Sequence, residues 1–119
     1  MSRIMFVDDD TMMLKMACFI MKKAGHEGLT ASSGAEGLTK AAAEQPDMLF
    51  IDIEMPGMSG LELLEKLKAD SATAGIPACL MSGTVTDEIR AKAAELGAAG
   101  VIGKPLRADE IKDAIAKVL

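Results

Sequence analysis

The stretch Met48-Leu49-Phe50-Ile51-Asp52-Ile53-Glu54-Met55-Pro56 decides the fold of this chain. Its first four residues are apolar and follow the turn residues Gln45-Pro46-Asp47. A short apolar run between turn signals predicts a strand that is buried on both faces. Asp52 ends the run, and the proline and glycines of residues 55–60 predict a loop. The pattern therefore places a carboxylate at the carboxyl end of a central strand, where open parallel α/β sheets bind ligands.

Outward from this strand, apolar runs alternate with segments of helical periodicity. The predicted strands are 3–7, 28–32, 48–52, 77–82 and 100–103, and the predicted helices are 11–24, 35–44, 60–70, 86–96 and 109–119. Ser59 with Glu62 has the pattern of a capping box, Thr86 or a neighbour is expected to cap the next helix, and Gly25 and Gly97 end helices. This alternation is typical of a parallel sheet with right-handed crossovers.

The predicted fold class is α/β, with five strand–helix units in 119 residues. A barrel needs about 250 residues. We therefore expect a doubly wound, flavodoxin-like (βα)5 sandwich of three layers, with one five-stranded parallel sheet in the order 2-1-3-4-5. The length suits one domain over residues 1–119 and is too short for two.

Composition and charge exclude several classes of protein. Hydrophobic residues make up 50% and charged residues 26%, which is ordinary for a globular fold. No apolar run approaches the roughly 20 residues of a membrane helix, and Asp8-Asp9-Asp10 interrupt the first one, so no secretory signal is expected. A net charge of −5 argues against direct binding of nucleic acid. Cys18 and Cys79 are interpreted as buried, reduced thiols of a cytoplasmic protein.

Polar residues recur where the predicted strands end. Asp8 and Asp9 follow the first strand, Asp52 ends the third, Ser82 ends the fourth and Lys104 follows the fifth. Each has an ordinary explanation alone, as a helix cap, a turn residue or a solvated lysine. All five nevertheless fall on the same edge of the sheet, and the three carboxylates flank its switch point.

The charges of this group suggest its chemistry. Three carboxylates held close together repel one another, and a divalent cation removes that cost. Hard oxygen ligands favour magnesium, with manganese as an alternative. Metal and Lys104 together balance the three carboxylates, which prepares the site for a dianionic phosphoryl group. Asp52 can then act as the nucleophile, while the metal and Lys104 stabilise charge and Ser82 donates a hydrogen bond.

The whole chain resembles the receiver domains of two-component response regulators, of the chemotaxis-regulator type. The resemblance is carried by four motifs, Val7-Asp8-Asp9-Asp10, Ile51-Asp52-Ile53-Glu54-Met55-Pro56-Gly57, Leu80-Met81-Ser82-Gly83 and Lys104-Pro105. The family implies two-component phosphorelay signalling, in which Asp52 accepts a phosphoryl group from a histidine kinase or histidine phosphotransfer protein. It also implies a conformational switch that an output partner reads.

The resemblance further implies how magnesium would be bound. Asp9 would bind the ion directly, Asp8 mostly through water, and Asp52 and the backbone carbonyl of Glu54 would complete the protein ligands. Asp10 has no role to transfer from the family and is interpreted as a helix-start carboxylate.

The switch is where the sequence departs from the family. By resemblance, Ser82 would be the switch hydroxyl and Lys104 the phosphate partner, with a cis bond between Lys104 and Pro105. Most members carry an aromatic residue three positions before the lysine, but here Val101 stands there. Valine is stiff at its single χ angle and cannot swing a ring inward. We therefore expect the signal to be carried mainly by residues 83–86.

A partner surface is predicted on the first helix. On a helical wheel Met12, Met16 and Phe19 fall among the lysines of the solvent face. Methionine suits adaptable contacts, and in the family this helix meets the kinase helices. The alternative is that these are scattered surface hydrophobes, which are normal.

Two other functions compete with signalling. Glu54 lies two positions after Asp52, as a second acidic residue does in phosphohydrolases that work through an aspartyl phosphate. The chain is short for such an enzyme and lacks a cap domain, so we expect a non-enzyme with at most slow self-dephosphorylation. The other candidate is a receiver that works by docking alone, against which the complete set of site residues argues.

Overall fold

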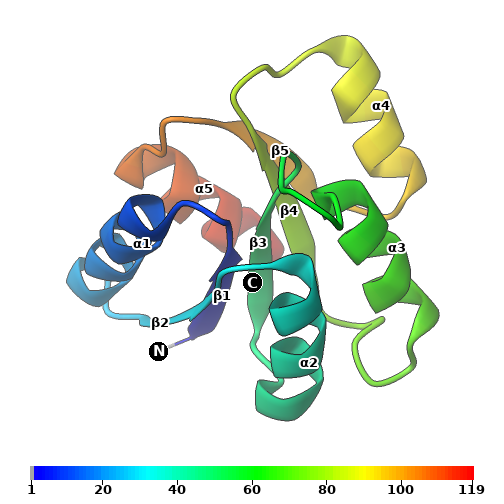
Figure 1. The fold of residues 1–119 in the computed structure, drawn as a ribbon. Helices are drawn as coiled ribbons and strands as arrows, with labels where there is room; N and C mark the ends of the chain where they lie inside the picture. The colour runs from blue at the N-terminus through cyan, green and yellow to red at the C-terminus, as the bar shows by residue number, and fades with distance from the viewer. Residues whose placement is uncertain (1) are drawn as a thin grey trace.

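The computed structural model, which describes residues 2–119, places five parallel strands in one sheet in the order β2-β1-β3-β4-β5 (Figure 1). The strands are β1 (Arg3–Val7), β2 (Glu27–Ala31), β3 (Met48–Asp52), β4 (Ala78–Ser82) and β5 (Gly100–Gly103). The helices are α1 (Thr11–Lys23), α2 (Gly34–Glu44), α3 (Gly60–Ala69), α4 (Asp87–Glu95) and α5 (Ala108–Val118). The predicted fold class and strand order are confirmed.

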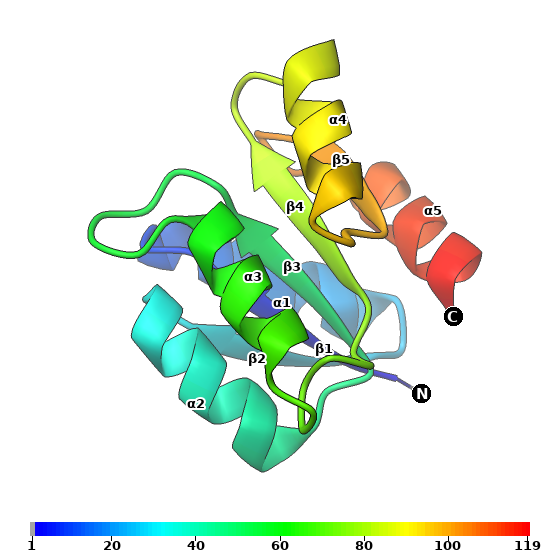
Figure 2. The same cartoon turned by 90° about the vertical axis from the view of Figure 1, so that its right-hand side faces the viewer.

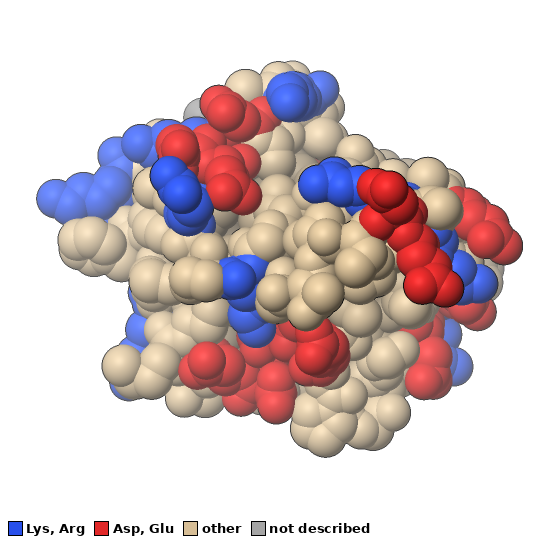
Figure 3. All heavy atoms as spheres, turned by 90° about the horizontal axis from the view of Figure 1, so that it is seen from above, with Lys and Arg blue, Asp and Glu red and all other residues tan. Residues whose placement is uncertain are grey.

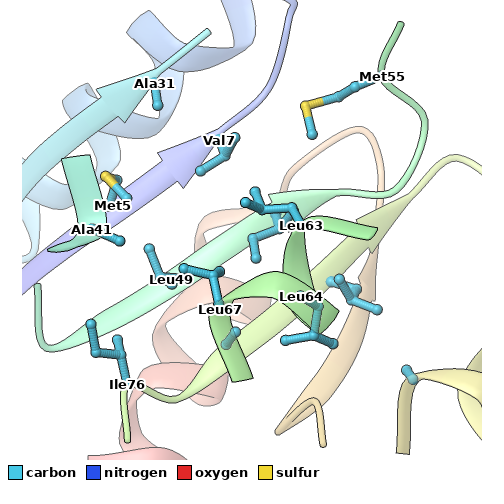
Figure 4. Close-up of a cluster of buried hydrophobic side chains, with 14 residues drawn as sticks. Met5, Val7, Ala31, Ala41, Leu49, Met55, Leu63, Leu64, Leu67 and Ile76 are labelled. Carbon is cyan, nitrogen blue, oxygen red and sulfur yellow. The ribbon is translucent and has the colours of Figure 1, made fainter. Parts of the chain in front are cut away.

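The helices form two layers, with α1 and α5 on one face of the sheet and α2, α3 and α4 on the other (Figure 2). Neighbouring side chains of a strand point to opposite faces. Leu49 and Ile51 therefore pack under α2 and α3, as Figure 4 shows for Leu49, whereas Met48 and Phe50 pack under α1 and α5. All five residues of β3 are buried, which explains why the strand is a continuous apolar run.

Two buried clusters hold the layers together. The cluster beneath α2, α3 and α4 centres on Leu63, Leu64 and Leu67 of α3 (Figure 4). On the opposite face, the rings of Phe6 and Phe50 stack with centroids 5.0 Å apart. Helix α1 contributes the buried residues Met13, Leu14, Ala17 and Met21 to that second cluster.

A close contact between α3 and β3 positions the loop that follows the central strand. A Cβ atom at Gly60 would lie far inside van der Waals contact with the backbone oxygen of Asp52. The Gly60 N–H also donates to the carbonyl of Ile53 at 2.9 Å. Only glycine lets the first turn of α3 approach the end of β3 this closely.

Side chains cap the helices largely as the sequence predicts. Asp10 accepts from the N–H groups of Met12 and Met13 at the start of α1. The hydroxyl of Ser59 accepts from the N–H of Glu62 at 3.2 Å, and Thr86 caps α4. These bonds satisfy N–H groups that lack partners within the helix.

Several predicted boundaries shift by one residue. Strand β2 covers residues 27–31 instead of 28–32, because Glu27 pairs with Arg3 while the Ser32 N–H donates to the carboxylate of Glu36. Strand β4 begins after Pro77, which has no N–H for the ladder.

The prediction that both cysteines are buried is wrong for Cys18, which is only partly buried, and right for Cys79. Among residues 2–119 no helix is long and apolar enough to cross a bilayer.

Candidate functional site

The carboxyl ends of β1 and β3 bring three carboxylates together. The side chains of Asp8, Asp9 and Asp52 offer oxygen atoms that lie within 4.8 Å of one another. Asp8 and Asp52 are buried, with 0% and 3% of their surfaces exposed, whereas Asp9 faces solvent. Figure 3 looks onto this edge of the molecule, where acidic and basic side chains lie close together among uncharged ones.

Lys104 reaches this cluster from the end of β5. Its Nζ atom lies 2.8 Å from Asp8 Oδ2 and 3.4 Å from Asp52 Oδ2. The other oxygen of Asp8 accepts from the N–H of Asp10 at 2.9 Å, so both oxygens of this fully buried carboxylate have partners. The bond between Lys104 and Pro105 is cis, as predicted.

The surroundings of Asp52 make its ionisation unfavourable. Burial and the neighbouring charge of Asp8 raise the pKa of Asp52 from 3.8 to about 6, although the charge of Lys104 and the Glu54 N–H oppose this rise. At Lys104 burial lowers the pKa of the ammonium, but the hydrogen bond and charge of Asp8, with Asp52, outweigh burial and raise that pKa overall. One cation thus serves two buried carboxylates.

The residues of the cluster fit a magnesium ion. Their side-chain donors are carboxylate oxygens, the hard ligands that magnesium prefers, and all three donors lie within 4.8 Å of one another, close enough to share one ion. Burial and the adjacent charge of Asp8 raise the pKa of Asp52, and a bound cation would oppose both effects.

Ser82 lies at the site, but within residues 2–119 its hydroxyl forms no hydrogen bond with Asp52. Its buried Oγ donates to the carbonyl of Thr84 at 2.8 Å and accepts from the Thr84 N–H at 3.1 Å. The Glu54 carboxylate lies 3.4 Å from the same Oγ. Sequence reasoning missed this contact between the Glu54 carboxylate and Ser82. The only signal for it in the sequence was that an acidic residue stands two positions after Asp52.

The predicted partner surface is exposed. Met12, Met16 and Phe19 expose 71%, 40% and 61% of their surfaces, and the ammonium of Lys23 lies 5.4 Å from the Phe19 ring centroid. A groove runs from Met12 and Met16 of this surface to Lys104, and it is lined by Asp10, Met12, Met13, Met16, Lys104, Pro105 and Leu106. Docking there remains a prediction.

Val101 sits in the middle of β5, directly opposite Leu80 of β4. Its side chain is partly buried against the cluster beneath α2, α3 and α4. It also lines a cleft beside α5, together with Cys79, Gly100 and Ala114.

Comparison with known proteins identifies the family. The response regulator receiver domain profile matches residues 4–116. The chain is 37% identical to chemotaxis protein CheY of Bacillus subtilis, in a match that covers 98% of this chain and 97% of CheY. It is 31% identical to protein PilH of Pseudomonas aeruginosa, in a match that covers 100% of this chain and 98% of PilH. The chain is also 28% identical to the phosphate regulon transcriptional regulatory protein PhoB of Escherichia coli. That match covers 98% of this chain but only 51% of PhoB.

The fold agrees with this assignment. The structure of chemotaxis protein CheY4 of Vibrio cholerae superposes with a TM-score of 0.94 at 27% identity, with 100% of this chain and 99% of that one covered. Phosphorylation and magnesium-dependent switching are general properties of receivers. The chain belongs to the response regulator receiver domain family, the signalling domains of two-component phosphorelay systems.

Proposed function

We propose that Asp52 is the phosphoacceptor of this receiver and that Asp8, Asp9, Asp52 and the backbone carbonyl of Glu54 bind the magnesium ion that phosphorylation requires. The donor is a histidine kinase or a histidine phosphotransfer protein. The observation that carries the proposal is the position of Asp52, which is buried at the end of β3 between an acidic cluster and the Lys104 ammonium.

Asp52 performs the chemical step. One of its carboxylate oxygens forms a bond to phosphorus as the bond between phosphorus and the donor imidazole nitrogen breaks, so the product is an acyl phosphate and a free imidazole. With a pKa of about 6, Asp52 is largely ionised above pH 7 and is available as the nucleophile. Bound magnesium would supply positive charge that balances the phosphoryl oxygens.

Lys104 and Ser82 act on the transferred group. The Lys104 Nζ atom already lies 3.4 Å from Asp52 Oδ2, so it is placed to pair with a phosphoryl oxygen there. The hydroxyl of Ser82 can donate to the same group once it leaves the carbonyl of Thr84. The deep burial of Asp52 restricts access of water, and we therefore propose only slow self-dephosphorylation.

Phosphorylation by a small donor tests the proposal. Acetyl phosphate with magnesium is expected to add one phosphoryl group, measured by intact mass, and the addition should vanish in EDTA and in Asp52→Asn. An Asp52→Asn variant that still gained one acid-labile phosphate would sink the assignment.

We further propose that the α1 surface formed by Met12, Met16 and Phe19 docks the helices of the phosphoryl donor. Its apolar side chains border the groove that leads to Lys104, so a partner seated there would reach Asp52.

A cytoplasmic location fits the family and the two free thiols.

The docking surface can be tested by the rate of phosphotransfer from the cognate donor. Met16→Ala and Phe19→Ala should slow transfer by roughly tenfold, as expected when an interface anchor is truncated. Leu119→Ala, an exposed apolar residue on the far end of the chain, is the matched control. Unchanged rates in both α1 variants would contradict docking at this surface.

A further inference from the structure

Glu54 contacts both the phosphoacceptor and the switch hydroxyl. Its backbone N–H donates to Asp52 Oδ1 at 3.3 Å, and its side-chain Oε1 lies 3.4 Å from Ser82 Oγ. These contacts join the end of β3 to the end of β4. The Glu54 side chain itself is exposed, so this bridge lies across the mouth of the site.

The hydroxyl of Ser82 has only one proton to donate. Thr84 supplies both a donor and an acceptor to it, at 3.1 and 2.8 Å, and Glu54 supplies a second acceptor. Because Ser82 is 1% exposed, water has little access to replace either acceptor. Of these two acceptors the Thr84 carbonyl at 2.8 Å is the nearer and the Glu54 carboxylate at 3.4 Å is the weaker, and a phosphoryl oxygen on Asp52 would be a third competitor for the proton.

We propose that the Glu54 carboxylate is a positioning residue, which holds the Ser82 hydroxyl away from Asp52 and so opposes engagement of the phosphoryl group. This inference rests on the proposed function of Asp52. A dianionic group on Asp52 repels the Glu54 carboxylate and attracts the Ser82 proton. Phosphorylation therefore releases the bridge, and the energy needed to break it lowers the affinity of the site for a phosphoryl group.

A simpler explanation is that Glu54 acts by its charge alone, and two substitutions separate the two mechanisms. Glu54→Gln removes the charge but keeps an oxygen acceptor of the same reach, whereas Glu54→Ala removes both. If charge alone matters, the two variants should behave alike. If the contact with Ser82 matters, they should differ, and the difference should require the Ser82 hydroxyl.

The metal-free protein provides the first test. In two-dimensional NMR spectra recorded in EDTA, Glu54→Ala should move the amide resonances of Ser82 and Thr84 further than Glu54→Gln does. A structural role without the hydroxyl contact would move only the resonances next to residue 54. Unmoved Ser82 and Thr84 resonances in Glu54→Ala would overturn the proposal.

Beryllofluoride with magnesium, a mimic of the phosphoryl group, provides the second test. In NMR titrations Glu54→Ala should bind the mimic about threefold more tightly than Glu54→Gln, the size of effect expected for one weak hydrogen bond. In a Ser82→Ala background the two substitutions should give equal affinities. Two outcomes would overturn the proposal. One is that Glu54→Ala and Glu54→Gln bind the mimic equally tightly when Ser82 is kept. The other is that their affinities still differ when Ser82 is replaced by alanine.

The two tests also separate this inference from the proposed function. Failure of the parent protein to bind beryllofluoride would count against Asp52 as the phosphoacceptor. The metal-free spectra decide the contact between Glu54 and Ser82 independently of that result.

Discussion

At the residue scale, Asp52 shows how the fold opposes an ionisation that the chemistry needs. In the folded protein the pKa of Asp52 is about 6, above its ordinary value of 3.8, because the carboxylate is buried beside Asp8. The folded state therefore binds this proton more tightly than the unfolded state does. The stabilisation from that proton is fully present below about pH 4 and is lost as the pH rises through 6.

The first prediction at this scale concerns Asp52→Asn in the absence of metal. Above pH 7 the variant should unfold with a free energy larger than that of the parent by on the order of 1–3 kcal/mol, because it removes a buried charge. Urea unfolding in EDTA at pH 5 and pH 8 measures the effect, which should shrink at the lower pH. Asp113→Asn, on the exposed side of α5, is the control, and an equal gain at both pH values would contradict the ionisation argument.

Gly60 is a second residue on which the site depends. In an ordinary helix glycine to alanine stabilises by about 1 kcal/mol. Here the added Cβ would collide with the Asp52 backbone, so Gly60→Ala should instead destabilise the protein by about 2 kcal/mol or more. Urea unfolding tests the sign, with Gly75→Ala, where a Cβ meets nothing within 4 Å, as the control.

Sequence reasoning succeeded for residues whose positions follow from strand ends. Asp8, Asp52 and Lys104 lie together because parallel strands end at one edge, and the order of strands can be inferred from the pattern. It could not predict that the Ser82 hydroxyl turns toward Thr84 and Glu54. The partners of the Ser82 hydroxyl depend on side-chain rotamers and loop geometry, and the spacing of residues in the sequence carries no information about either.

At the element scale, α4 is the least anchored helix beside the site. Its only buried residue is Ala93, whereas α3 buries Leu63, Leu64 and Leu67. The connection from β4 to α4 begins with Gly83, around which a Cβ would meet nothing within 4 Å. Few buried apolar contacts give a segment a low free energy of local opening. This loop and helix can therefore move at small cost when Ser82 changes partners.

The prediction at this scale concerns where the switch signal travels. When beryllofluoride and magnesium bind, amide chemical shifts should change most at residues 52–54 and 82–86, and should fade at Val101 and in α5. The reason is that Val101 has no ring to move between buried and exposed positions, so β5 gains few new contacts. Equally large changes across β5 and α5 would show that a full switch operates without an aromatic residue.

The elements themselves were predictable because their signals are local. Caps such as Ser59 and Thr86 and the buried face of α1 follow from periodicity and side-chain chemistry. The errors lie where tertiary contacts decide. Strand β2 shifted by one residue because Arg3 binds Glu27, and Cys18 is partly exposed because it lies in a groove between α1 and β2.

At the scale of the whole molecule, the topology concentrates negative charge at one end of the sheet. The central strand β3 ends in the buried Asp52, the buried Asp8 directly follows β1, and the chain carries a net charge of −5. The two hydrophobic clusters pack against both faces of these strands and hold their ends in place. The apolar core therefore provides the free energy that keeps the carboxylates together, and a cation that binds only the folded arrangement should stabilise the entire molecule.

The last prediction follows from this linkage. At a magnesium concentration ten times its dissociation constant, the folded state should gain about 1.4 kcal/mol. For a protein of 119 residues this corresponds to a rise of about 5 °C in the thermal midpoint, measurable by circular dichroism. Sodium chloride of equal ionic strength is the control for screening.

Variants of the acidic cluster decide whether this gain comes from the site. Asp9→Asn should abolish most of it, because Asp9 is the exposed carboxylate of the cluster and its loss leaves the buried pair with Lys104 intact. Asp109→Asn, in the first turn of α5, changes the net charge equally but lies outside the cluster and should keep the gain. A magnesium effect of the same size in both variants would mean that the ion binds elsewhere, and Asp52 would lose the metal on which its proposed chemistry depends.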